Sequence, residues 1–81
     1  MSLETIRRQI DDIDDAILAL LIRRMELALE TRSLKQNTED KTRETEIINR
    51  IRAIAAGSLD PDFCEQVYRL IISESKRLQQ L

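Results

Sequence analysis

The sequence predicts an all-α fold of one long and two shorter helices. Three observations support this prediction. Apolar residues recur at intervals of three and four from residue 3 to residue 20, no segment alternates as a strand would, and the only Gly and the only Pro lie close together, at Gly57 and Pro61. A chain of 81 residues has the size of one domain, so residues 1–81 are expected to form a single helical domain.

The first helix is expected over about residues 3–35. Its apolar positions are spaced 3, 4, 3, 4 and 3 apart and form a heptad seam: Leu3, Ile6, Ile10, Ile13, Ile17 and Leu20. No Gly or Pro interrupts the pattern before Lys35. Such a helix is about 48 Å long, which is more than two shorter helices of the same chain can cover. The sequence therefore predicts a dimer, in which a second copy covers the seam.

The two shorter helices are recognised by their ends. Gly57 stands just past the last apolar residues of the second helix, as a C-terminal cap does, so this helix is expected over about 42–56. Asp60 followed by Pro61 is typical of an N-cap and a first helical residue. The third helix is therefore expected over about 61–80, with these apolar positions: Phe63, Val67, Leu70, Ile71 and Leu78.

Composition excludes several classes of function. The formal net charge of −2 does not favour nucleic acid as a partner. The chain has no His and a single Cys, Cys64, so we expect neither a zinc site nor a disulfide within the chain, and no other metal or cofactor. No apolar stretch approaches the ~20 residues of a membrane span, and no signal peptide is evident. We expect a cytoplasmic protein without a membrane partner.

Three cations of the first helix suggest a site shared between two chains. Arg24 occupies a seam position, and Lys35 follows eleven residues later on the same face. Arg7 lies about 25 Å before Arg24 along the axis. One straight helix cannot place all three around one small ligand, whereas two antiparallel copies can. Taken alone, Arg24 has a simpler explanation, because its long side chain can extend to solvent.

Polar residues also interrupt the apolar faces of the shorter helices. Ser75 and Gln79 continue an apolar row of the third helix, and Glu44 lies on the apolar face of the second, next to Arg43 and close to Asp40. Taken alone, each has an ordinary explanation. Ser75 and Gln79 would be exposed residues near a helix end. Glu44 would be a favourable acid in the first helical turn, Arg43 a solvated charge and Asp40 an N-cap. Together they predict a pocket for a small anion that carries a hydroxyl group.

Three segments, in this order, resemble the all-α chorismate mutases of the AroQ type. They are IRRQIDDIDDAILALLIRRMELALETRSLK in the first helix, DKTRETEII at the start of the second and LIISESKRLQ in the third. The similarity covers nearly the whole chain. It implies an intertwined homodimer with antiparallel long helices and two equivalent sites. It also implies the rearrangement of chorismate to prephenate, on the route to phenylalanine and tyrosine, without a cofactor.

The resemblance implies how the two carboxylates of chorismate would be held. Arg24 would bind one of them, supported by Ser75. Arg7 of the second chain would bind the other, across the dimer interface. The reaction is unimolecular and pericyclic, so it needs no acid, base or nucleophile. Catalysis can come from holding the substrate in a reactive conformer and from hydrogen-bond donors at the ether oxygen, where negative charge develops.

The remaining site residues would contact the ether oxygen and the ring hydroxyl. Lys35 and Gln79 would donate to the oxygen of the breaking C–O bond, and Lys35 would be the main electrostatic contributor. Glu44 and the region of Asp40 would hold the ring hydroxyl. Arg43 would frame the site. By the same resemblance these residues are the expected catalytic and substrate-binding set, together with the residues that hold the carboxylates.

The chain departs from the family pattern at a few positions. Thr31 and Lys76 stand where apolar lining residues are expected, and the loop at 36–39 is short. Two other interpretations stay open. An isochorismate–pyruvate lyase would share the fold and make salicylate. A non-catalytic helical dimerisation module would explain the heptad seam, but it does not explain the polar residues on inward faces.

Overall fold

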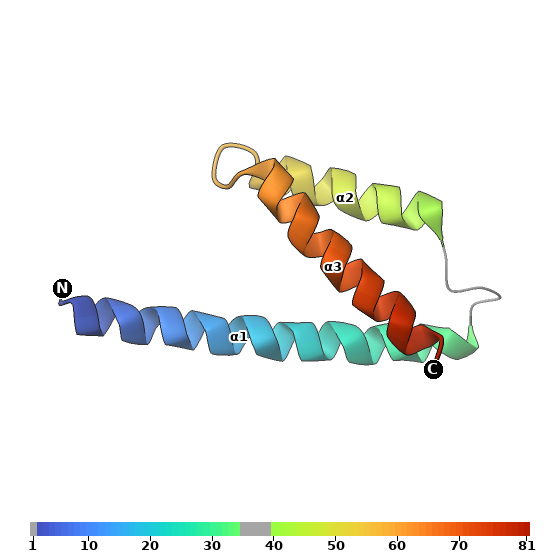
Figure 1. Ribbon diagram of the computed structural model, residues 1–81, viewed down its shortest axis with the longest axis horizontal. Helices are drawn as coiled ribbons and strands as arrows, with labels where there is room; N and C mark the ends of the chain where they lie inside the picture. Colours follow the sequence, from blue (N-terminus) through green and yellow to red (C-terminus); the bar gives the residue numbers. More distant parts are fainter. Residues whose placement is uncertain (1, 35–39) are drawn as a thin grey trace.

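The computed structural model describes residues 2–34 and 40–81 (Figure 1). These residues contain no strand and form three α-helices and one short 3-10 helix: α1 (Leu3–Glu30), η1 (Thr31–Ser33), α2 (Lys41–Ala55) and α3 (Pro61–Gln79). The predicted all-α fold is therefore confirmed. Within the described ranges, no helix has both the length and the apolar character that crossing a membrane requires.

The three helices form an elongated, thin body with extents of 52 × 26 × 14 Å. α2 and α3 are joined by a short turn and pack together as a hairpin. α3 runs from the turn of this hairpin to the C-terminal part of α1 (Figure 1). The N-terminal half of α1 extends beyond the hairpin. The hairpin therefore covers only one end of the long helix.

The long helix ends earlier as an α-helix than the expected residue 35. α1 stops at Glu30 and the chain continues as the 3-10 helix η1. The hydroxyl of Thr31 donates to the carbonyl of Ala28 at 2.7 Å, and the backbone N–H of Leu34 donates to the carbonyl of Thr31 at 3.0 Å. These bonds to the third preceding residue tighten the last turn. Lys35 lies outside the described residues.

The shorter helices begin at aspartate N-caps and lie within one residue of their expected bounds. A carboxylate oxygen of Asp40 accepts the N–H of Arg43 at 2.9 Å, and one of Asp60 accepts the N–H of Asp62 at 3.0 Å. Each bond satisfies a backbone donor that the first helical turn leaves without a partner. Gly57 follows α2 with a φ of 84°, a left-handed conformation that costs glycine little.

The buried core is small and lies between α2 and α3. It consists of Ile47, Ile48 and Ile72, with the partly buried Ile51 and Tyr68 packed against it. α1 contributes no buried residue. The six residues of its heptad seam, from Leu3 to Leu20, are each 41–71% exposed. A single chain therefore leaves a long apolar stripe in contact with water.

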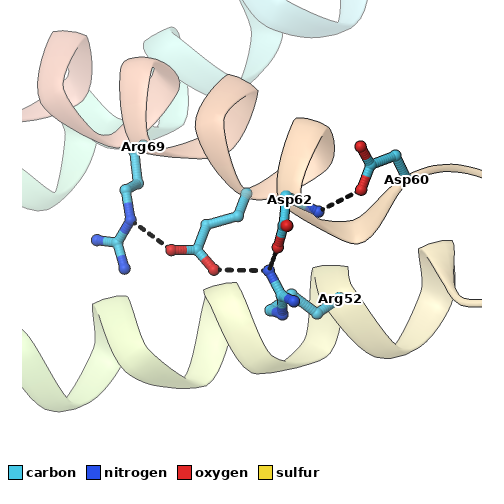
Figure 2. A network of polar contacts seen from close by, with 5 residues as sticks. Arg52, Asp60, Asp62 and Arg69 are labelled. Carbon is cyan, nitrogen blue, oxygen red and sulfur yellow. Dashed lines mark hydrogen bonds and ion pairs between the residues drawn. The ribbon is translucent and has the colours of Figure 1, made fainter.

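An ion-pair network closes the turn end of the hairpin (Figure 2). Arg52 of α2 lies with Nη1 2.9 Å from Asp62 Oδ1 and 3.0 Å from Glu65 Oε1, both on α3. Arg69 donates from Nε to the other oxygen of Glu65 at 2.8 Å. The pKa of Glu65 is lowered mainly by Arg69 and to a lesser extent by Arg52. The pKa of Arg52 is raised mainly by Asp62 and to a lesser extent by Glu65. The network ties the end of α2 to the start of α3.

Glu65→Gln should destabilise the protein in a pH-dependent way. The pKa of Glu65 in the folded chain lies below its ordinary value of 4.5. Its charge therefore contributes stability that is fully present above that ordinary value and is lost as the pH falls through the lower folded value. The Tm of the variant should lie below that of the wild type at about pH 7, and the difference should close toward about pH 2.

Glu74→Gln is the matched control for this experiment. An arginine on the same helix, Arg77, also lowers the pKa of Glu74 and contacts it at 2.7 and 2.8 Å, but no second helix is involved. Thermal melts followed by circular dichroism should show a smaller decrease in Tm for Glu74→Gln. Equal decreases for the two variants would contradict the bridging role of Glu65.

Candidate functional site

A cavity of about 270 Å³ lies between the C-terminal end of α1 and the α2–α3 hairpin. Its volume is slightly below the range of about 300–1,000 Å³ that is typical of small-molecule sites. All three helices line it: Arg24, Leu27, Ala28, Thr31, Asp40, Arg43, Glu44, Ile47, Ile72, Ser75, Lys76 and Gln79. The lining combines apolar walls with charges of both signs, which suits an anion that also has an apolar ring.

Six of the eight residues predicted for the site line this cavity: Arg24, Asp40, Arg43, Glu44, Ser75 and Gln79. Arg7 does not, because it is exposed near the start of α1, about 25 Å along the helix from Arg24. Lys35 lies outside the described residues, so its place at the site stays a prediction. The structure therefore brings together the predicted residues of α2, of α3 and of the C-terminal half of α1.

Arg24 is fixed on the α3 side of the cavity by Ser75. Its Nη1 donates to the Ser75 hydroxyl at 2.9 Å, and that hydroxyl donates to the carbonyl of Ile71 at 2.9 Å. Ser75 is only 8% exposed, so the explanation of an exposed helix end is wrong for it. A guanidinium has five N–H donors. The contact with Ser75 uses one of these donors. It fixes the orientation of the Arg24 guanidinium relative to the cavity, which Arg24 lines.

Glu44 forms an ion pair that the sequence did not reveal. Its Oε1 lies 2.9 Å from Nζ of Lys76 on α3, and the side chains are 23% and 30% exposed. This oxygen is buried, and its contact with Lys76 does not have the angles of a hydrogen bond. The signal for Lys76 was available, because it follows Ile72 by one helical turn and so shares its inward face.

Asp40 and Arg43 contribute to the cavity from the start of α2. The carboxylate of Asp40 caps the helix, as its ordinary explanation predicts, by accepting the N–H of Arg43. The Arg43 side chain is 57% exposed and lies 3.6 Å from Glu46. Both residues are thus more open to water than Glu44, and they sit where a ligand in the cavity would meet solvent.

Gln79 is held at the junction of α1 and η1 by its side-chain amide nitrogen. Nε2 donates to the carbonyl of Ala28 at 3.0 Å and to the hydroxyl of Thr31 at 2.9 Å. Gln79 is 6% exposed, so the explanation of an exposed helix end is wrong here as well. Thr31, which departs from the expected apolar lining, is therefore a hydrogen-bond partner of a predicted site residue.

A comparison with the models of known protein families shows which family the chain belongs to. The model of the family described as chorismate mutase type II matches residues 6–80. The chain belongs to this chorismate mutase family. No curated protein and no solved structure gave a significant match. The resemblance carried by the three sequence segments is thus confirmed, and the reaction of the family is an isomerisation of chorismate.

Arg24→Leu in this chorismate mutase family member should not lower stability. Leu27 and Ile72 line the cavity together with Arg24, and Ser75 keeps its bond to the carbonyl of Ile71 when Arg24 is lost. A leucine would bury apolar surface where a charge now stands, so the Tm should be equal to or higher than that of the wild type. A circular-dichroism melt measures this, and a marked decrease would show that Arg24 holds the fold.

Proposed function

We propose that the chain is a chorismate mutase that converts chorismate to prephenate for the synthesis of phenylalanine and tyrosine. One observation carries the proposal: Arg24, Ser75 and Gln79 meet in a single cavity, with Ser75 and Gln79 buried. Buried polar groups at the end of a small helical domain need a reason beyond stability. Recognition of a dianion with an ether oxygen and a ring hydroxyl supplies one.

The reaction matches what the cavity offers. A Claisen rearrangement breaks a C–O bond and forms a C–C bond within one molecule, and no proton moves to or from the enzyme. The chemistry therefore requires a compact conformer of the substrate and donors at the ether oxygen. Arginine holds carboxylates well because its planar fork of N–H groups matches their geometry. The charged and neutral donors of the cavity are of the kinds that this task requires.

In this proposal each described site residue has one task. Arg24, oriented by Ser75, binds one carboxylate of chorismate. Glu44 accepts a hydrogen bond from the ring hydroxyl, and Asp40 supports it from the N-cap. Arg43 closes the mouth of the cavity. Lys76, whose Nζ lies 2.9 Å from Oε1 of Glu44, holds the Glu44 carboxylate at the wall of the cavity.

Three further residues complete the proposed site. Lys35 and Gln79 donate to the ether oxygen, and the partner's Arg7 binds the second carboxylate. The exposed seam of α1 supports the dimer that this requires, since a second antiparallel copy would cover the stripe from Leu3 to Leu20. Such pairing would bring the start of one α1 beside the middle of the other. We therefore propose an intertwined homodimer with two equivalent sites.

The activity is tested by incubating the purified chain with chorismate and following the loss of its ultraviolet absorbance. Acid then converts prephenate to phenylpyruvate, which identifies the product. Lys35→Ala should reduce kcat/KM by about 100-fold or more, or about 3 kcal/mol, which is typical of removing such a donor. Arg50→Ala is the control, because Arg50 is exposed on α2 and does not line the cavity.

The outcome separates the alternatives. No conversion of chorismate by a folded chain would contradict the proposal, and conversion of isochorismate to salicylate instead would identify a lyase. A chain inactive on both substrates would leave the helical dimerisation module. Arg24→Leu sharpens this comparison, because the enzyme should lose activity while its Tm is maintained, whereas a module would lose nothing.

The shared site is tested by mixing two inactive variants. Arg7→Ala and Lys35→Ala damage different halves of each proposed site, so a mixed dimer contains one intact and one doubly altered site. Statistical mixing should restore about a quarter of wild-type activity, because half of the dimers are mixed and each has one of two sites intact. Co-expression followed by the chorismate assay measures this, and the absence of any recovery would contradict the intertwined dimer.

A further inference from the structure

We propose that Lys76 is a specificity-determining residue: its ammonium, paired with Glu44, makes the site accept a ring hydroxyl and reject a ring ammonium at the same place. This inference deepens the proposed function and rests on it, because the proposed function places the ring hydroxyl of chorismate at Glu44. Lys76 stands where the family pattern leads us to expect an apolar residue. The discrimination is therefore a property of this chain that does not follow from the family pattern.

Lys76 and Glu44 meet at the wall of the cavity, at the edge of the apolar core. Nζ of Lys76 lies 2.9 Å from Oε1 of Glu44, and both residues line the cavity. Lys76 follows the core residue Ile72 by one helical turn, and Glu44 precedes the core residue Ile48 by one turn. Their side chains are 30% and 23% exposed, and Oε1 of Glu44 is itself buried. Water therefore screens these two charges less than it screens a fully exposed pair.

The pair formed by Lys76 and Glu44 has no net charge but keeps the capacity to accept a hydrogen bond. A carboxylate has two oxygens with about four lone-pair sites, so contact with one ammonium leaves room for a hydroxyl proton. A neutral ring hydroxyl can therefore donate to Glu44 with Lys76 in place. For a ring ammonium, the attraction of Glu44 is opposed by the positive charge of Lys76, and the ammonium also loses hydration on entering the cavity.

An uncharged side chain in place of Lys76 would reverse this balance. Glu44 would then be a carboxylate without a compensating charge on the wall of the cavity, and such a group favours a cation as its partner. The two arginines of the described lining, Arg24 and Arg43, contact other side chains. The compensating charge at Glu44 is therefore that of Lys76. Its loss also weakens the attraction for chorismate, a dianion, more than for an analogue that carries an ammonium.

Lys76→Met tests the inference, because methionine keeps a long unbranched side chain and removes the charge. The two substrates are chorismate and 4-amino-4-deoxychorismate, in which an amino group, protonated at about pH 7, replaces the ring hydroxyl. Each rearranges within one molecule, so the loss of the conjugated ring diene is followed by ultraviolet absorbance in both cases. The ratio of kcat/KM for the amino analogue to kcat/KM for chorismate should rise at least about tenfold in the variant, because a unit charge beside the ring ammonium is removed.

Two control variants separate the charge of Lys76 from other effects. Lys76→Arg keeps a cation, so the ratio should stay within about threefold of the wild-type ratio. Arg77→Met removes a cation from the next residue of α3, which is 60% exposed, pairs with Glu74 at 2.7 Å and does not line the cavity. Water screens such a charge, so this variant should leave the ratio unchanged. An equal rise in Lys76→Arg and Lys76→Met would overturn the inference, because packing and not charge would then be responsible.

Partial unfolding of a variant cannot imitate the expected result, because both rates are measured on the same preparation and the amount of folded enzyme cancels in the ratio. If the amino analogue binds without reacting, its Ki relative to KM for chorismate is measured instead and should fall at least about tenfold in Lys76→Met.

The remaining outcomes separate the inference from the proposed function. An unchanged ratio in a Lys76→Met enzyme that converts chorismate would overturn the inference and leave the proposed function intact. A wild-type enzyme with equal kcat/KM for the two substrates would do the same. A wild-type chain without activity on chorismate would overturn the proposed function and the inference with it.

Discussion

The placement of α1 on α3 is selected by hydrogen bonds that involve two buried polar residues of α3. Ser75 contacts Arg24 at 2.9 Å, and Gln79 contacts Ala28 at 3.0 Å, while α1 itself has no buried residue. Buried polar groups must find partners, so these bonds select one placement of α1 on α3. They also form the wall of the cavity. The contacts that position the long helix are therefore made by the groups proposed to bind the substrate.

The α2–α3 hairpin is held together at two places. The apolar core adjoins the cavity, because its residues Ile47 and Ile72 also line it, whereas the network around Arg52 lies away from the cavity. The seam of α1 is left exposed, so its apolar surface can stabilise the protein only when another surface covers it. In the proposed homodimer a second copy does this and supplies an arginine to the site. Folding, assembly and substrate binding would then be coupled.

The two unexpected polar residues of the lining share a property. Thr31 accepts a hydrogen bond from Gln79, and Lys76 lies 2.9 Å from Glu44, so each contacts a residue of the predicted site. Polar groups placed beside the residues of the predicted site restrict the orientation of those residues. The lining of the cavity is therefore more polar at these two positions than the apolar residues that the family pattern predicts there.

The sequence by itself determined the helical class, because the heptad spacing and the Asp60–Pro61 pair act locally. It also predicted the inward faces of Ser75 and Gln79, since helical periodicity assigns each side chain to a face. Tertiary structure alone decided what lies opposite those faces. Periodicity contains no information about the partner across an interface. The contact between Thr31 and Gln79 could therefore be found only once the helices were packed together.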